Sequence, residues 1–364
     1  MKKPLSVLSL LLLIPTLVFA QQTKVITAEK HNEYGLVYSL PVTALQITVT
    51  AQKETRTPGP YRQYAKRYIG TSDVVADEAV TWTIRDIQVT PVGVKGDDPT
   101  QYLMQLKAGA TTFIGVAPNG MLLSINAEPE DYDFQPSIGS VAGKVISSGG
   151  DVNDYLKFVD MDFVSAQNSM RQAEMVASSL MDARESREAI KYGTSDFNPT
   201  DSRQYEMMLN SINEQIDAMT RAFTGSVTVE EFSSRFVYIP EEEGDEVVFR
   251  LSDFNGLVDP DDYSGSPVYI KTEILSEGTL PQDANGEAKK FPKDGVVYSI
   301  PGTARITVYT DRKKLLTGEY EFSQFGTTFA LSPSLFTDKK SPSYARFSPQ
   351  TGALLEIGKI KGTD

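Results

Sequence analysis

The side chains that usually carry covalent or metal chemistry are scarce in this sequence. Its 364 residues include no cysteine and a single histidine, His31. Cysteine nucleophiles and zinc sites built from histidine and cysteine are therefore excluded. A Ser-His-Asp hydrolase would have to use His31, yet no Gly-x-Ser-x-Gly elbow accompanies it, and phosphate-binding and dinucleotide fingerprints are absent as well. The sequence predicts no cofactor.

Carboxylates are the one potentially catalytic group that is abundant in the sequence, which contains 48 aspartates and glutamates. Two of them could act as acid and base on a glycan, although any fold of this composition contains many such pairs. The densest acidic loop has Asp259, Asp261 and Asp262, which could offer oxygen ligands to Ca²⁺. It lacks the glycine and the terminal glutamate of a helix-flanked calcium loop, which favours a solvated turn between strands.

A second candidate site is a short segment rich in tyrosine and basic residues. Pro58-Gly59-Pro60 opens it and Gly70 closes it, a pattern that predicts a short helix. Its candidate partner-binding residues are Tyr61, Arg62, Tyr64, Arg67 and Tyr68. They could form a docking surface for an acidic or aromatic partner, because tyrosine and arginine often dominate interfaces. The alternative is that the tyrosines pack this helix onto a sheet while the basic side chains stay in water.

The elements that would position these residues contain an internal repeat. Gly35–Ala44 returns as Gly295–Ala304 with seven identities, and each copy is followed by a related turn and strand at Gly120–Ile125 and Gly352–Ile357. Alternation of apolar and polar residues predicts strands through both copies. We therefore expect two related β-rich units, sandwich-like or barrel-like, that superpose on each other.

A helical stretch separates the two copies. Apolar residues recur every three or four positions over Met170–Ile190 and Tyr205–Phe223, which predicts two amphipathic helices in an antiparallel hairpin. Leu180, Leu209, Ile212 and Ile216 are its expected seam. Arg187 lies on the apolar stripe, which indicates either an ion pair with the facing helix, for instance with Glu214, or an edge left for another protein.

These patterns predict an α+β chain in four parts. They are a signal peptide over 1–20, a first β-rich domain over 21–150, a helical hairpin over 151–224, and a second β-rich domain over 225–364 that contains the repeat copy 295–357.

The N-terminus has the features of an export signal. Lys2 and Lys3 precede a short apolar stretch, Leu5–Ile14, and Ala20 ends a small-residue cleavage site. No later segment is long enough for a transmembrane helix, and the lack of cysteine excludes a lipid anchor of the cysteine type. The net charge of -13 becomes -15 when two lysines leave with the signal, which disfavours nucleic acid as a partner.

Taken together, the landmarks of the chain resemble a family of exported proteins from Bacteroidetes-type bacteria, domain of unknown function 4831. The resemblance is carried by Gly35–Ala44, Pro58–Tyr68, Phe254–Asp259 and Pro349–Ile357. It implies an envelope location, periplasmic or associated with the outer membrane, and supplies no activity, ligand or catalytic residue.

We therefore expect an exported scaffold or binding protein without enzymatic activity. Its expected partner is another envelope protein or a glycan. The alternative is a hydrolase that uses a carboxylate pair on a glycan or another envelope polymer, which a cleft lined by paired acids and aromatic residues would favour.

Overall fold

The structure is a computed structural model that describes residues 35–97, 99–104, 113–129, 139–195, 201–292, 294–336 and 341–360, without the side chains of 140–142. The chain is rich in β-strands and forms several sheets, as predicted. No helix in these ranges is long and apolar enough to cross a membrane.

The strands fall into two groups along the chain. Before the long helices they are β1 (Leu36–Ser39), β2 (Val42–Thr57), β3 (Ala79–Val94), β4 (Gln101–Met104), β5 (Ile114–Val116), β6 (Leu122–Ile125) and β7 (Gly139–Ser147). After them they are β8 (Ser226–Tyr238), β9 (Gly244–Ser252), β10 (Gly256–Val258), β11 (Ser266–Ser276), β12 (Val296–Tyr309), β13 (Lys314–Leu331), β14 (Ser343–Phe347) and β15 (Leu354–Lys359).

The helices are η1 (Arg62–Tyr64), α1 (Ala65–Tyr68), η2 (Asp154–Phe158), α2 (Met161–Ser165), α3 (Ser169–Tyr192), α4 (Ser202–Thr224) and the isolated η3 (Pro333–Leu335), where η marks a 3₁₀ helix. Most helical residues lie between the two groups of strands, whereas η1 and α1 lie between β2 and β3, and η3 lies between β13 and β14.

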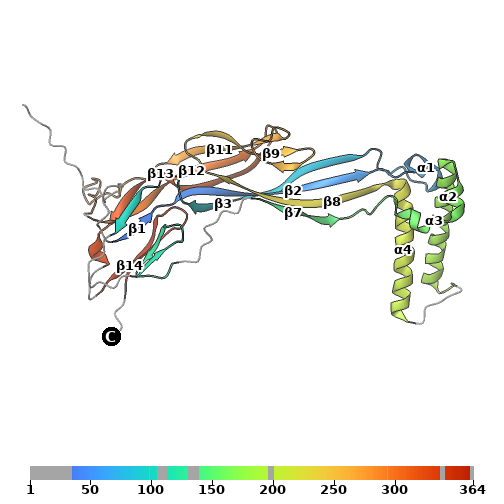
Figure 1. Cartoon of the computed structure of the whole chain (residues 1–364), viewed down its shortest axis with the longest axis horizontal. Helices are drawn as coiled ribbons and strands as arrows, with labels where there is room; N and C mark the ends of the chain where they lie inside the picture. The colour runs from blue at the N-terminus through green and yellow to red at the C-terminus, as the bar shows by residue number, and fades with distance from the viewer. Residues whose placement is uncertain are drawn as a thin grey trace, which may run out of the picture.

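The molecule is elongated and has three parts, which we call the body, the arm and the tip (Figure 1). The body contains most of the sheets. The arm is the far half of a four-stranded sheet of order β3-β2-β8-β7, which runs out of the body. The tip comprises residues 58–78, 151–195 and 201–224, and its helices α3 and α4 lie across the end of the arm. Because β2 has 16 residues, the sheet is about 50 Å long.

The core of the body lies between two sheets. The near half of the β3-β2-β8-β7 sheet packs on a five-stranded sheet of order β10-β9-β11-β12-β13. Phe236 stacks on Phe249 with ring centres 4.9 Å apart. Fully buried residues from both sheets complete the core, among them Leu45, Ile47, Val49, Ile270, Ile306, Val308 and Phe322. In β2 these residues alternate with less buried ones, which is why the sequence pattern revealed this half of the strand.

Strands from before and after residue 225 share sheets, so the strands do not separate there as the expected domains would require. β8 pairs with β2 along its whole length, from Ser226 opposite Thr57 to Tyr238 opposite Leu45. β14 pairs with β6 in a further sheet of order β15-β14-β6-β5. Where the sequence indicated two consecutive β domains, strands from before and after residue 225 lie side by side in two of the sheets.

The repeated residues nevertheless make equivalent local contacts. The amide of Ser39 donates to the carbonyl of Gly120 at 3.0 Å, and the amide of Ser299 donates to the carbonyl of Gly352 at 3.0 Å. Both glycines have positive φ angles, 88° and 70°, which glycine adopts with little strain. The superposition of the complete copies stays a prediction.

The two long helices begin and end at recognisable capping residues. The Asn168 side chain accepts from the amide of Met170 at 2.8 Å at the start of α3, and Gly193 ends that helix with φ of 67°. The Asp201 side chain accepts from the amide of Gln204 at 2.8 Å at the start of α4. Asp201 is thus the N-cap of α4.

Candidate functional site

The tip has a hydrophobic core of its own, distinct from that of the body. Residues from 58–78, η2, α2, α3 and α4 form it, including Tyr61, Ala65, Tyr155, Phe163, Leu180, Ile216, Met219 and Phe223. An ideal Cβ on Gly59 would lie 2.6 Å from the carbonyl oxygen of Ala222. The Pro-Gly-Pro segment therefore brings the backbone of residue 59 directly onto the last turn of α4, where only glycine fits.

Tyr61 is part of this core and is only 4% exposed. Its amide donates to the carbonyl of Ala222 at 2.9 Å, its ring centre lies 5.8 Å from that of Phe223, and its hydroxyl lies 3.2 Å from the hydroxyl of Tyr155. Burial raises the pKa of the Tyr61 hydroxyl. The prediction that Tyr61 contacts a partner directly is therefore not supported, because its side chain is enclosed by the tip.

The other four predicted docking residues lie nearer the surface. Arg62 and Arg67 are exposed, whereas Tyr64 and Tyr68 are half-buried. The hydroxyl of Tyr64 lies 3.2 Å from that of Ser169 on α3, and the guanidinium of Arg67 lies 5.3 Å from the centre of the Tyr68 ring. The tyrosines thus pack this segment onto the helices of the tip, not onto a sheet as the alternative proposed.

An ion-pair network links η2 to the end of α4. Arg221 Nη2 lies 3.2 Å from Asp154 Oδ2, and Lys157 Nζ lies 2.7 Å from Asp154 Oδ1. The hydrogen bond from Lys157 and the charges of Lys157 and Arg221 hold the pKa of Asp154 below its usual range. The network stabilises the tip only while this carboxylate is ionised.

Acid is therefore expected to weaken the tip through Asp154. Since the folded pKa is lower than the unfolded value of about 3.9, the contribution is present above the unfolded pKa and is lost as the pH falls through the folded pKa. We expect Asp154→Asn to lower the thermal midpoint at pH 7 and to have a smaller effect below about pH 4. Circular dichroism melts across this range measure the difference.

The matched control for this prediction is Asp162→Asn. Asp162 is exposed on α2 and has no ion pair with a residue described in the structure. Its replacement should leave the midpoint nearly unchanged at both pH values. An Asp154→Asn effect that stays constant from pH 7 to pH 3 contradicts the assignment.

The seam between α3 and α4 is tightest at the end near the arm. Leu180 and Ile216 are buried, whereas Leu209 and Ile212, nearer the start of α4, are only half-buried. Arg187 pairs with its neighbour Glu188, whose carboxylate lies 3.2 Å from the guanidinium, so the suggested pair with Glu214 is not observed. Arg187 is 30% exposed and needs no partner from the facing helix.

The acidic loop after β10 is organised around an arginine. Arg250 donates to the carbonyl of Pro260 at 2.6 Å and to the carbonyl of Gly265 at 3.2 Å, and it lies 4.6 Å from the centre of the Tyr263 ring. The amide of Asp262 donates to the carbonyl of Asp259 at 3.0 Å, as in a turn.

This arrangement leaves the calcium hypothesis unsupported. Over the described ranges, no cluster of three or more acidic or histidine side chains is placed to hold a metal ion, and this includes Asp259, Asp261 and Asp262. The carbonyls of Pro260 and Gly265 in this loop accept hydrogen bonds from the cationic guanidinium of Arg250, whose charge disfavours a second cation nearby.

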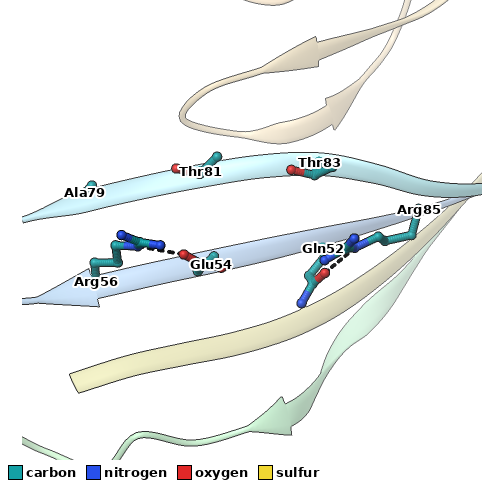
Figure 2. A pocket seen from close by; sticks show the side chains of 7 residues that line it. All are labelled: Gln52, Glu54, Arg56, Ala79, Thr81, Thr83 and Arg85. Atoms are coloured by element: carbon teal, nitrogen blue, oxygen red, sulfur yellow. Dashed lines mark hydrogen bonds and ion pairs between the residues drawn. The ribbon is translucent and has the colours of Figure 1, made fainter. Parts of the chain in front are cut away.

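Sequence reasoning missed a groove on one face of the arm. Side chains of β2 and β3 line a cavity of about 250 Å³ (Figure 2). Its lining residues are Gln52, Glu54, Arg56, Ala79, Thr81, Thr83 and Arg85. A second cavity of about 810 Å³ shares Arg56 and Ala79 with it and continues to the junction of arm and tip.

The charges in the groove are not arranged for acid-base catalysis. Glu54 is the only carboxylate that lines the smaller cavity, and Arg56 Nε donates to it at 2.7 Å. Arg85 donates to the side-chain oxygen of Gln52 (Figure 2). The groove therefore offers a polar binding surface of mixed charge instead of the pair of carboxylates that glycoside hydrolysis needs.

Comparison with known proteins identifies one family. A family model described as a domain of unknown function, DUF4831, matches residues 34–355. No curated protein and no solved structure matches the sequence.

Proposed function

Because the chain belongs to the DUF4831 family, whose description states no activity, we propose its function from its shape and surface. We propose that it is an exported binding or scaffold protein of the bacterial envelope, without enzymatic activity. The tip contacts another envelope component, a protein or a glycan, through the outer surface around Arg62 and Arg67.

The arm is the observation that carries this proposal. The far half of a sheet that is about 50 Å long holds the tip away from the body (Figure 1). An enzyme needs its groups gathered in an enclosed site, whereas a protein that bridges two components gains reach from such a projection. The body serves as the base of the arm, and the helices α3 and α4 form the tip at its end.

The surface of the tip supports the same role. Arg62 and Arg67 are exposed in a protein with a net charge of -13. On α2, Met161 and Val164 are 78% and 69% exposed, and their spacing of three residues places them on one helical face. The tip thus exposes both basic and apolar side chains, a composition that is typical of a surface that binds a partner.

The test is a charge reversal on the tip with a matched reversal on the body. In Arg62→Glu/Arg67→Glu, partners cross-linked to the wild-type protein in envelope preparations should be lost. The control Arg312→Glu/Lys313→Glu makes the same change of charge at an exposed turn between β12 and β13 and should retain them. Both variants alter exposed side chains, so the free energy of unfolding of each should lie within about 0.5 kcal/mol of the wild-type value.

Retention of every partner by the tip variant would overturn the proposal. Turnover of an envelope glycan by the purified wild-type protein would instead favour the carboxylate hydrolase.

A further inference from the structure

The outer edge of β3 differs from the other sheet edges in the described residues. Proteins normally protect an edge strand by making it short, charged or irregular. β5 and β10 have three residues each, and β1 and β4 have four. β15 carries Glu356 and Lys359, β13 carries Glu319 and Glu321, and β7 is interrupted by two register shifts.

None of these devices protects β3 from Ala79 to Ile84. This stretch reads Ala-Val-Thr-Trp-Thr-Ile, without charge, proline or glycine, and four of its six side chains are exposed. Its register with β2 is unbroken from Ala79 opposite Arg56 to Ile84 opposite Ala51, and the first irregularity follows at Arg85. A regular, uncharged edge of this length is a template for another strand.

The backbone of this edge is available to a partner. β3 pairs with β2 on one side only, and no other described segment forms a backbone hydrogen bond with residues 79–84. The amides and carbonyls that point outward therefore have only water as a partner, which is the situation that β-strand addition uses.

The side chains on the two faces define what the added strand should contain. Thr81, Thr83 and Arg85 lie on the groove face (Figure 2), whereas Val80, Trp82 and Ile84 lie on the opposite face. Trp82 is held there by Phe232, with ring centres 5.0 Å apart, and by the backbone of Gly256. Arg85 donates to Gln52, and no described carboxylate forms an ion pair with it.

We infer that Ala79–Ile84 is a docking site for an extended polypeptide segment of a partner protein. The segment adds to the sheet as a fifth strand next to β3. It places apolar side chains beside Val80, Trp82 and Ile84, and it places a carboxylate near Arg85 on the groove face. This site is independent of the proposed contact surface on the tip, so either can fail without the other.

The probe is a fluorescent peptide of nine residues that alternates valine with threonine and carries one glutamate on the threonine face. Binding to the full chain is measured by fluorescence anisotropy. Two further peptides are methylated on the backbone nitrogens of alternate residues. In the first peptide the methyl groups block the amides along one edge of the strand, and in the second they block the amides along the opposite edge. Because only one edge can pair with β3, one methylated peptide should bind at least about tenfold more weakly than the unmodified peptide. The other should bind as well as before.

A charge swap then locates the site. Arg85→Glu should weaken binding of the glutamate peptide about tenfold, and a peptide with lysine in place of glutamate should recover the loss. Arg312→Glu is the control and should change neither affinity.

Three results would overturn the inference: no binding of the unmodified peptide at millimolar concentration, equal binding of both methylated peptides, or indifference to the charge swap. Concentration-dependent dimerisation of the chain in sedimentation, abolished by Arg85→Glu, would instead assign the edge to a second copy.

Discussion

Replacing Tyr61 with alanine is expected to unfold the tip and leave the body folded. The ring is buried against Phe223 and Tyr155, so its removal leaves a cavity between the start of the tip and the end of α4. Replacing a buried aromatic side chain by alanine typically costs about 3–5 kcal/mol. The tip core does not merge with the body core, so the loss should be local.

Limited proteolysis combined with circular dichroism measures this. In Tyr61→Ala, cleavage within residues 151–224 should accelerate and part of the helical signal should melt early, while the β signal melts as in wild type. Tyr61→Phe keeps the ring and loses only the hydroxyl contacts, so we expect it to lower the stability of the tip by about 1 kcal/mol. Arg62→Ala, one residue away and exposed, is the control and should behave as wild type. A Tyr61→Ala protein as resistant as that control would show that the residue is not buried in solution.

The burial of Tyr61 also explains why it was the least accurate of the predicted docking residues. Composition does not distinguish a tyrosine that packs in a core from one that binds a partner, since both roles use its apolar ring and its hydroxyl. The informative signal was the neighbouring Pro58-Gly59-Pro60. We interpreted this segment only as the start of a short helix, whereas the structure places Gly59 against the carbonyl of Ala222, a close approach that a glycine permits.

Strands were predictable where one face is buried. Leu45–Thr50 alternates because Leu45, Ile47 and Val49 enter the core of the body. The continuation from Gln52 to Arg56 is polar on both faces, since the arm is a sheet with solvent on both sides, and the period-two signal disappears there. Alternation over Val80–Arg85 does predict the neighbouring strand of the arm, but it does not indicate that the sheet projects from the body.

The pairing of strands was not predictable from local pattern. The repeat located corresponding strands, but the pairing of Ala345 on β14 with Ile125 on β6 joins residues far apart in sequence. Alternation specifies which face of a strand is buried and contains no information about its neighbour. Likewise, nothing in the acidic loop indicated that Arg250 would fill it.

The repeat also supplies a matched pair of tyrosines for the second large effect. Tyr38 is 2% exposed, and its hydroxyl donates to the carbonyl of Val297 at 3.1 Å and accepts from the amide of Val297 at 2.8 Å. It thereby joins the first copy to the second. Tyr298, its counterpart, is half-buried, and its hydroxyl forms no hydrogen bond with another described residue.

Replacing Tyr38 with alanine is therefore expected to destabilise the body by about 3–5 kcal/mol through the cavity that it leaves. Tyr38→Phe keeps the ring but leaves the buried Val297 amide without its acceptor, which should cost about 1–3 kcal/mol. The free energy of unfolding of Tyr298→Phe should stay within about 0.5 kcal/mol of the wild-type value. Urea unfolding measures these differences, and hydrogen exchange at the Val297 amide reports the lost bond directly. If Tyr38→Phe and Tyr298→Phe are equally stable and Val297 exchanges at the wild-type rate in both, the Tyr38 hydroxyl does not join the two copies.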